Sequence, residues 1–265
     1  MSILELNGLT RRFGDLTAVN GVNLSIRAGE IFGLLGPNGA GKTTVIKMLT
    51  TLLPPSAGSA RVAGFDISKH SARVRAQIAY VPQLVSADGG LTATENLRLF
   101  AKLYGVPRRE IAPRVSDALK FVGLDEAADR VVRGYSGGMV RRLEIALALI
   151  HRPRVLFLDE PTVGLDPLAR QTVWQQVRLL VKEFGMTILL TTHFMEEADS
   201  LCDRIAIMNR GQVTATGTPA ELKIALGSPD ATLDDVFAHY SGEQLETEGD
   251  FRDITRARRN AVRLG

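Results

Sequence analysis

The sequence predicts an α/β protein in which a purely helical segment interrupts the alternation of strands and helices. The apolar run Ile31–Leu35 leads directly into a glycine-rich loop and a helix. Helical periodicity alone fills residues 91–151, and strand-like and helix-like segments alternate again from residue 155. Because continuous apolar runs of this length are typical of strands buried on both faces, we expect a central sheet covered by helices.

The composition limits the class of protein. The chain has 265 residues, 45% of them hydrophobic and 23% charged, which suits one large domain or one domain with a subdomain. A net charge of +3 without a basic block does not indicate a specific nucleic-acid binder, so no nucleic-acid partner is expected. The single cysteine, Cys202, excludes an internal disulfide and is expected to be a packed, inert thiol.

The sequence also limits the expected location of the protein. No apolar run approaches the roughly 18 residues that a membrane-spanning helix needs. The first residues lack the basic region and the long apolar core of a signal peptide. We therefore expect a cytoplasmic protein whose role at a membrane, if it has one, comes through a partner.

The first elements follow from local patterns. Residues 3–6 and 17–26 alternate apolar and polar side chains, which predicts short antiparallel strands and hence an N-terminal antiparallel β-subdomain. The apolar run before the glycine-rich loop predicts a buried strand of the central sheet. The other elements expected in this part of the chain are the helix Lys42–Leu49 and the strands 58–62 and Ile78–Val81.

The segment from about 91 to 151 is expected to form an inserted α-helical subdomain. Thr92 and Glu95 have the spacing of a capping box, in which two side chains satisfy backbone N–H groups at a helix start. Apolar residues then recur at helical spacing in three stripes. The stripes consist of Leu97, Phe100, Leu103 and Tyr104, of Val115, Leu119 and Val122, and of Leu143, Ala146, Leu147 and Ile150.

The α/β alternation then resumes. A further helix is expected at Thr218, which is followed by a proline in the first turn and by Glu221 three residues on. The polar tail beyond residue 241 is expected to be solvated, and basic contact with a partner or membrane surface is the alternative. The remaining elements are strands at 155–158, 187–190 and 204–208 and helices at 168–184 and Met195–Leu201, and the tail carries Arg252, Arg256, Arg258, Arg259 and Arg263.

Residues 36–43 read GPNGAGKT and match every fixed position of the phosphate-loop pattern between a strand and a helix. Such a loop points its backbone N–H groups into one concavity, and the helix start adds its dipole. Lys42 is expected at the β- and γ-phosphates, Thr43 at Mg²⁺ and Thr44 at the α-phosphate. The nucleotide-binding residues predicted in this loop are Asn38, Gly39, Ala40, Gly41, Lys42, Thr43 and Thr44.

Two adjacent carboxylates, Asp159 and Glu160, end the apolar strand 155–158. Their burial is costly unless a cation or polar partner meets them. In phosphate-loop ATPases an Asp at this point supports Mg²⁺. Because side chains alternate along a strand, Glu160 is expected to point differently and to face a water in line with the γ-phosphate. The alternative is a helix cap or a surface carboxylate pair.

A second glycine-rich helix start follows at Ser136-Gly137-Gly138. Ser136 can cap the helix, and the exposed N–H groups offer another anion site. Taken alone, this triplet is more often a simple turn.

Together these motifs resemble those of ABC-transporter ATPase subunits. The phosphate loop, Gln83, Ser136-Gly137-Gly138, Asp159-Glu160, Gly164-Leu165-Asp166 and His193 occur in the order and approximate spacing of that family. The resemblance covers residues 3 to about 225. It implies a phosphate-loop NTPase core with a RecA-like mixed sheet, an ATPase domain over 3–226 and a C-terminal extension over 227–265.

The resemblance also implies roles for single residues. Two such domains dimerise head to tail, so that ATP at Lys42 of one is closed over by Ser136 and Gly138 of the other. Gln83 would contact Mg²⁺ and the attacking water and sense the membrane partner, or be a solvated loop residue. His193 would contact the γ-phosphate, or be structural.

Three further residues have implied roles. Asp166 would lie at the dimer interface, or be a plain N-cap before a proline. Phe13 would stack on adenine with Val19 on the ribose side, or belong to the core.

A narrower resemblance is to the daunorubicin-resistance type of exporter ATPase. Three stretches carry it: residues 136–146, 191–198 and 232–237. Met139 suits this subgroup, whereas Val140 replaces the basic or polar residue expected there.

The subgroup resemblance implies an ATP-hydrolysing motor with a second ATPase subunit, as a homodimer, that pairs with ABC-2-class membrane subunits on the cytoplasmic side of the membrane. The alternatives are an ABC-type ATPase acting on DNA or ribosomes and, more remotely, a nucleotide kinase. The first alternative usually carries coiled-coil insertions, cysteine pairs or two ATPase units. The second leaves Ser136 and His193 without a purpose.

Overall fold

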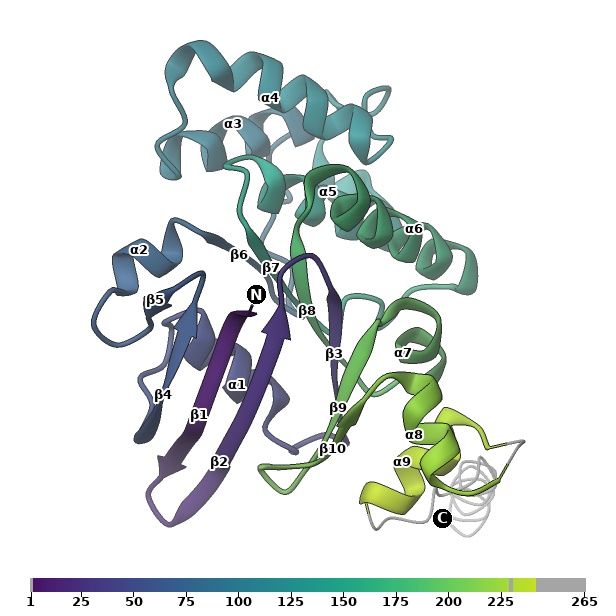
Figure 1. The fold of residues 1–265 in the computed structure, drawn as a ribbon. Helices are drawn as coiled ribbons and strands as arrows, with labels where there is room; N and C mark the ends of the chain where they lie inside the picture. Colours follow the sequence, from purple (N-terminus) through teal and green to yellow (C-terminus); the bar gives the residue numbers. More distant parts are fainter. Residues whose placement is uncertain (1, 229–230, 242–265) are drawn as a thin grey trace, which may run out of the picture.

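The computed structural model describes residues 2–228 and 231–241, and it confirms the predicted α/β class with two sheets and flanking helices (Figure 1). An antiparallel sheet carries the N-terminus and has the strand order β2-β1-β4-β5. Residues Leu4 and Leu6 pair with Ile26 and Leu24, so the two predicted N-terminal strands do lie antiparallel. The strands of this sheet are β1 (Ser2–Phe13), β2 (Leu16–Arg27), β4 (Ala57–Val62) and β5 (Phe65–Asp66).

The central sheet is mixed and has the order β10-β9-β3-β8-β7-β6. The pairs β9–β3, β3–β8, β8–β7 and β7–β6 are parallel, and β10 pairs antiparallel with β9 at one edge. Its strands are β3 (Ile31–Leu35), β6 (Ile78–Val81), β7 (Val155–Asp159), β8 (Thr187–Thr192), β9 (Arg204–Asn209) and β10 (Gln212–Gly217). The carboxyl ends of the parallel strands therefore share one edge of the sheet, which is where ligands bind in such folds.

The helices cover the sheet and build a separate helical layer at the top of Figure 1. That layer holds α3 and α4, and α5 and α6 lie between it and the sheet. The three apolar stripes predicted for 91–151 all form helices, and Thr92 and Glu95 make the predicted capping box. The helices are α1 (Lys42–Leu49), α2 (Ser71–Arg75), α3 (Ala93–Leu103), α4 (Arg108–Phe121), α5 (Gly137–Leu149), α6 (Pro167–Phe184), α7 (Met195–Leu201), α8 (Pro219–Ala225) and α9 (Leu233–Ser241).

Strand β3 shows how the sheet separates two cores. All five of its residues are buried. Phe32 and Leu34 join the core shared with the antiparallel sheet and α1, whereas Ile31 and Leu35 join the core beneath the helices. Alternation along the strand sends successive side chains to opposite faces, so one short strand supports both cores. The phosphate loop that follows β3 is thus anchored on a strand without exposed side chains.

The structure also contains elements that the sequence patterns missed. The N-terminal strands are longer than 3–6 and 17–26, because bulges let β1 and β2 stay paired across irregular residues. The short elements β5 and α2, the edge strand β10 and helix α9 were not predicted. Helix α9 packs on α7, α8 and β9 and buries Leu233, Val236 and Phe237. The arginine-containing tail lies outside the described residues.

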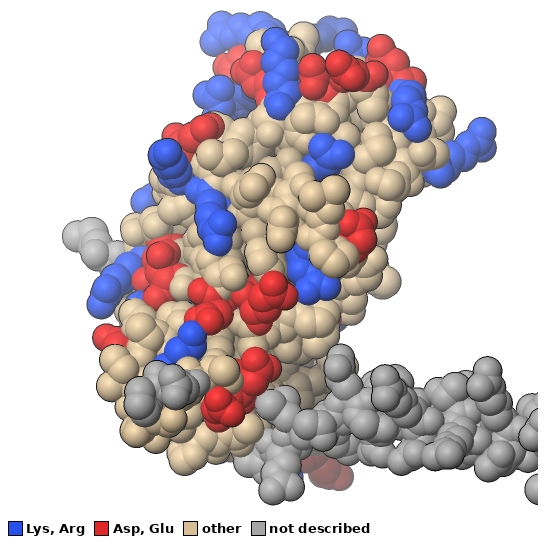
Figure 2. Space-filling view, turned by 90° about the vertical axis from the view of Figure 1, so that its right-hand side faces the viewer, with Lys and Arg blue, Asp and Glu red and all other residues tan. Residues whose placement is uncertain are grey.

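Two surface properties bear on function. Among the described residues, the structure has no helix with both the length and the apolar composition needed to cross a membrane. Figure 2 shows the right-hand side of Figure 1, where Lys and Arg side chains are interspersed with Asp and Glu side chains. This face therefore shows mixed charge rather than the basic stripe typical of nucleic-acid binders.

Candidate active site

The phosphate loop lies at the carboxyl edge of the central sheet, between β3 and α1. Two of its glycines are required by close approach to neighbouring backbone. A Cβ on Gly36 would lie 2.3 Å from the carbonyl oxygen of Met208. Gly41 has a φ of 102° and a Cβ there would lie 2.4 Å from the carbonyl oxygen of Ala18. The loop therefore packs directly against the backbone of β2 and β9, which leaves no room for a side chain at these two positions.

A cavity of about 200 Å³ opens in front of this loop. The helix start of α1 and its dipole face the cavity, which makes the cavity an anion site. Every loop residue predicted to hold nucleotide lines it, together with Gln83 and Glu160 from two other segments. The lining residues are Ala18, Asn38, Gly39, Ala40, Gly41, Lys42, Thr43, Thr44, Gln83 and Glu160.

Lys42 is the cation of the cavity, and its side chain is only 5% exposed. Its ammonium donates to the carbonyl oxygens of Gly36 at 2.6 Å and Pro37 at 3.0 Å and lies 3.7 Å from Glu160 Oε1. Burial lowers the pKa of Lys42, although the nearby carboxylates of Glu160 and Asp159 act in the opposite direction. The ammonium is thus held at the mouth of the loop by backbone and carboxylate oxygens.

Asp159 ends β7 and is almost fully buried, with an exposure of 2%. Its Oδ1 accepts hydrogen bonds from the hydroxyls of Thr43 at 3.0 Å and Thr191 at 2.6 Å, and its Oδ2 accepts from Tyr80 at 3.2 Å. Burial and the Asp159 charge both raise the pKa of Tyr80. Thr191 and Tyr80 were not found from the sequence. The available signal was polar residues near the ends of the strands that flank β7.

Glu160 leaves the strand in a left-handed conformation with a φ of 49°, and its N–H is held by the carbonyl and hydroxyl oxygens of Thr191. The side chain diverges from Asp159 because the chain turns here, rather than by simple strand alternation. Gln83 Nε2 donates to Glu160 Oε2 at 3.3 Å, and His193 Nδ1 lies 3.3 Å from Glu160 Oε1. Backbone strain at such a position is typical of functional sites.

The side chains at this edge fit a Mg²⁺ ion. Thr43 and Asp159 place hydroxyl and carboxylate oxygens 3.0 Å apart, and these are the hard ligands that Mg²⁺ prefers. In the described part of the chain no cluster of three or more His, Cys, Asp or Glu side chains could enclose a metal. Mg²⁺ is usually held by one or two protein oxygens, with water and phosphate oxygens completing its shell, so this donor set suits it.

The remaining predicted residues lie elsewhere. Ser136 caps α5 and accepts a hydrogen bond from the Met139 N–H at 3.3 Å. Asp166 caps α6 and accepts from the Ala169 N–H at 2.9 Å. The two helix starts are neighbours, since a Cβ on Gly138 would lie 3.0 Å from the Cβ of Ala169. None of these residues lines the phosphate-loop cavity of the same chain.

Phe13, predicted to meet adenine, ends β1 and is 45% exposed. The guanidinium of Arg11 lies 4.7 Å from its ring centroid. Phe13 does not line the cavity of about 200 Å³, and it is also not a core residue.

A buried ion pair that the sequence patterns did not reveal links α5 to the segment around Gln83. Arg141 and Glu144 lie 3.0 Å apart. Arg141 donates to the carbonyl oxygens of Pro82 and Gln83, and Glu144 Oε1 accepts from the N–H and hydroxyl of Ser86. The helix that starts at Ser136 is therefore tied directly to the loop that carries Gln83.

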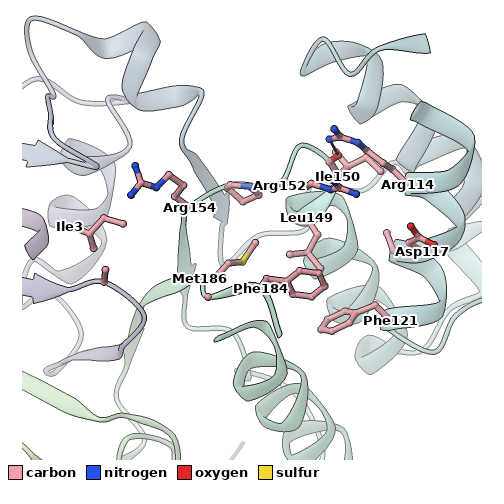
Figure 3. Close-up of a pocket in the computed structure, with 14 residues that line it drawn as sticks. Ile3, Arg114, Asp117, Phe121, Leu149, Ile150, Arg152, Arg154, Phe184 and Met186 are labelled. Atoms are coloured by element: carbon pink, nitrogen blue, oxygen red, sulfur yellow. Dashed lines mark hydrogen bonds between the residues drawn. The ribbon is translucent and has the colours of Figure 1, made fainter. Parts of the chain in front are cut away.

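A larger cleft, of about 410 Å³, opens at the opposite edge of the sheet, where Ala28, Arg154 and Met186 precede strands β3, β7 and β8. Figure 3 shows apolar side chains, among them Leu149 and Phe184, between the β1 side and helix α4. Because it lies where the strands begin, this cleft is separate from the phosphate loop.

The geometry defines the class of protein as a phosphate-loop NTPase. A lysine at a helix start faces a Thr–Asp pair suited to Mg²⁺ and a glutamate beside a glutamine and a histidine. A model of the ABC transporter family matches residues 19–163, more than half of the chain. The chain belongs to this family and is an ATP-binding ATPase subunit.

Individual relatives agree with this assignment. The chain is 47% identical over 220 residues to the Nod factor export ATP-binding protein I of Ralstonia nicotianae, covering 83% of this chain and 68% of that protein. It is 48% identical over 225 residues to the daunorubicin/doxorubicin resistance ATP-binding protein DrrA of Streptomyces peucetius, covering 85% and 68%. Both relatives are named for export or resistance.

Solved structures show the same fold. One described as the ATP-binding subunit of an ABC transporter superposes with a TM-score of 0.80 at 30% identity, covering 90% of this chain and 99% of that chain. A dimeric ATP-binding cassette in a post-hydrolysis state, bound to ADP and Pi, has a TM-score of 0.72 at 27% identity and covers 81% and 98%.

Proposed function

We propose that this chain is the ATP-hydrolysing motor of a bacterial exporter, powering transport through separate membrane subunits of the ABC-2 class. The proposal rests on the fact that the predicted site residues lie in two separate places. Lys42, Glu160, Gln83 and His193 converge at the phosphate loop, whereas Ser136 and Asp166 start two adjacent helices outside that cavity. The names of the relatives support export as the direction of transport.

Nucleotide binding falls to the phosphate loop. The backbone N–H groups of 39–42 and the Lys42 ammonium hold the β- and γ-phosphates, and the Thr44 hydroxyl meets the α-phosphate. Thr43, Asp159 and Gln83 would hold Mg²⁺, which when bound neutralises charge on the phosphate oxygens. Phe13, exposed at the end of β1, stacks on adenine.

Glu160 orients the attacking water and accepts its proton, at a position fixed by Gln83 Nε2 and by the left-handed backbone. His193 contacts the γ-phosphate from the side of β8. Since phosphoryl transfer needs little covalent help from the protein, catalysis rests on positioning and on the charge of Lys42.

The dimer completes the site. Ser136 and Gly138 lie at the start of α5, whose first N–H groups form a second anion site. This helix start does not line the phosphate-loop cavity of its own chain. In a head-to-tail dimer that helix start closes over the ATP of the partner, with Asp166 at the interface. The likeness to a dimeric cassette supports this arrangement. The ATPase domain spans 3–226, with the helical subdomain at about 91–151 and the C-terminal extension at 227–265.

The membrane subunit is expected to dock a helix between the Gln83 loop and α3. Four apolar side chains of these segments are exposed, by between 44% and 81%: Leu84, Val85, Leu103 and Tyr104. Large apolar side chains left exposed in this way are candidates for contact with another protein. This docking would place the chain at the cytoplasmic face of the membrane.

Co-purification of the tagged full-length chain from its own cells tests the proposal. We expect an integral membrane protein in stoichiometric amount, lost when Leu84 and Leu103 are both changed to Asp. The matched control is Ile224→Asp, which alters an equally exposed apolar side chain on α8. Recovery of ribosomes or DNA without any membrane protein would contradict the proposal and favour the DNA- or ribosome-acting alternative.

A further inference from the structure

The buried carboxyl group of Glu197 lies between the two segments that carry Glu160 and His193. Glu197 is in the first turn of α7, four residues after His193, and has no exposed surface. Its Oε1 accepts a hydrogen bond from the Thr162 hydroxyl at 2.8 Å. Thr162, also fully buried, stands two residues after Glu160. The Thr162–Glu197 hydrogen bond therefore links the segment that follows Glu160 to the segment that follows His193.

The third member of the bridge comes from α6. Trp174 Nε1 donates to the same Oε1 of Glu197 at 2.9 Å, and Trp174 is buried, with an exposure of 6%. Asp166 caps α6, which begins at Pro167, so the turn of residues 160–166 is fixed at both ends, by β7 and by α6. The bridge adds a fixed point in the middle of that turn.

The other oxygen, Glu197 Oε2, is buried and has no hydrogen-bond partner in the part of the chain that the structure describes. A buried carboxyl group with only one of its oxygens hydrogen-bonded contributes less to folding stability than an apolar side chain of similar size. Packing alone would therefore favour leucine or methionine here. The group is more readily explained by the geometry that it fixes than by the stability that it contributes.

We infer that Glu197 is a positioning residue of the ATPase site, and that the Thr162–Glu197–Trp174 bridge sets the spacing between Glu160 and His193. His193 Nδ1 and Glu160 Oε1 lie 3.3 Å apart on two different segments. Without the bridge, α7 and the 160–166 turn shift independently of each other. A misplacement of about 1 Å can cost roughly a hundredfold in rate. The inference rests on the roles proposed above for Glu160 and His193.

Steady-state ATPase measurements on the full-length chain and its variants test this inference. Thr162→Val and Glu197→Leu should lower kcat by about ten- to a hundredfold, with the KM for ATP changed by less than about threefold. Glu197→Gln keeps an oxygen acceptor for both donors and should stay within about threefold of the wild-type kcat. Unchanged kcat in Glu197→Leu, or loss in Glu197→Gln equal to that in Glu197→Leu, would overturn the inference.

Gln176→Leu is the matched control. Gln176 lies on α6 two residues from Trp174, is equally buried, and also has one hydrogen bond, to the Val122 carbonyl, and one oxygen without a partner among the described residues. It does not touch the 160–166 turn or α7 through these contacts. Its kcat should match the wild type, and a loss as large as that of Glu197→Leu would show a merely structural effect.

A second measurement does not depend on turnover. Trp174 is the only tryptophan of the chain, so its indole N–H gives one identifiable NMR signal. We expect this signal to move when Mg-ATP replaces Mg-ADP, and to move less in Thr162→Val. An identical signal with both nucleotides would contradict the inference. Full turnover in Glu160→Gln would instead remove the proposed role of Glu160, whereas an inactive Glu160→Gln beside a fully active Glu197→Leu would remove only the bridge.

Discussion

Removal of one partner from the buried Arg141–Glu144 pair should destabilise the protein more than any change to an exposed ion pair. The two side chains are 7% and 1% exposed and lie 3.0 Å apart. Burial raises the pKa of Glu144, although Arg141 and the Ser86 N–H act in the opposite direction, so its charge is already disfavoured. Arg141→Met leaves that charge without a counter-charge and should cost about 3–5 kcal/mol.

The double variant Arg141→Met/Glu144→Met separates the charge from the packing. Like Arg141→Met, it leaves the Pro82 and Gln83 carbonyl oxygens without the Arg141 donor. In place of the buried charge it leaves the Ser86 N–H and hydroxyl without an acceptor, which costs about 1–3 kcal/mol. The double variant should therefore be more stable than Arg141→Met alone. The matched control is Lys223→Met, which breaks the Lys223–Asp199 pair at 2.7 Å, whose side chains are 28% and 40% exposed. Such a pair contributes about 0–1 kcal/mol.

Urea unfolding followed by circular dichroism measures these differences from the midpoint and the slope of each curve. A double variant less stable than Arg141→Met would contradict this expectation, because the two losses would then add independently. A cost for Arg141→Met as small as that for Lys223→Met would also refute it.

Three further predictions concern the site and its surroundings. Lys42→Ala should lose ATP binding in calorimetry, because Lys42 is the only lysine among the described residues that line the cavity. Unchanged affinity would contradict the role proposed for the phosphate loop. Glu160→Gln should bind ATP while its kcat falls by about 10²–10⁴-fold, and wild-type turnover would exclude Glu160 as the base. Burial lowers the pKa of His151 and the charge of Arg114 adds to this effect, whereas the hydrogen bond to the Ile78 carbonyl acts in the opposite direction. The folded state therefore binds fewer protons than the unfolded state. The contribution of neutral His151 to the free energy of unfolding is therefore complete above the unfolded pKa of about 6.5 and is lost as the pH falls below that value. Between about pH 7.5 and 5.5 the free energy of unfolding should drop more in the wild type than in His151→Phe. Equal drops would contradict this assignment.

Local patterns predicted the parts of the fold that depend on neighbouring residues. The strand–loop–helix unit around Lys42 and the caps at Thr92, Ser136 and Asp166 follow from sequence spacing, and the structure confirms these elements. The caps of α5 and α6 are compatible with both interpretations of Ser136 and Asp166, so their place at a dimer interface stays a prediction.

Contacts between distant residues could not be predicted in the same way. The hydroxyls of Thr191 and Tyr80 reach Asp159 only because β8 and β6 flank β7, and strand order is not encoded in a local pattern. Arg141 and Glu144 look like a solvated charge pair on a helix, yet both are buried against the loop that follows β6. The left-handed turn at Glu160 has no local signal, because glutamate rarely adopts a positive φ.

We propose that each chain contributes one half of each of the two ATP sites of a dimer. Sedimentation of the full-length Glu160→Gln chain with Mg-ATP, with Mg-ADP and without nucleotide tests it directly. We expect a dimer only with Mg-ATP. We also expect that adding Ser136→Arg, which places a bulky cation at the start of α5, abolishes the dimer while ATP still binds. A chain that binds Mg-ATP and remains a monomer in the Glu160→Gln form would contradict the claim.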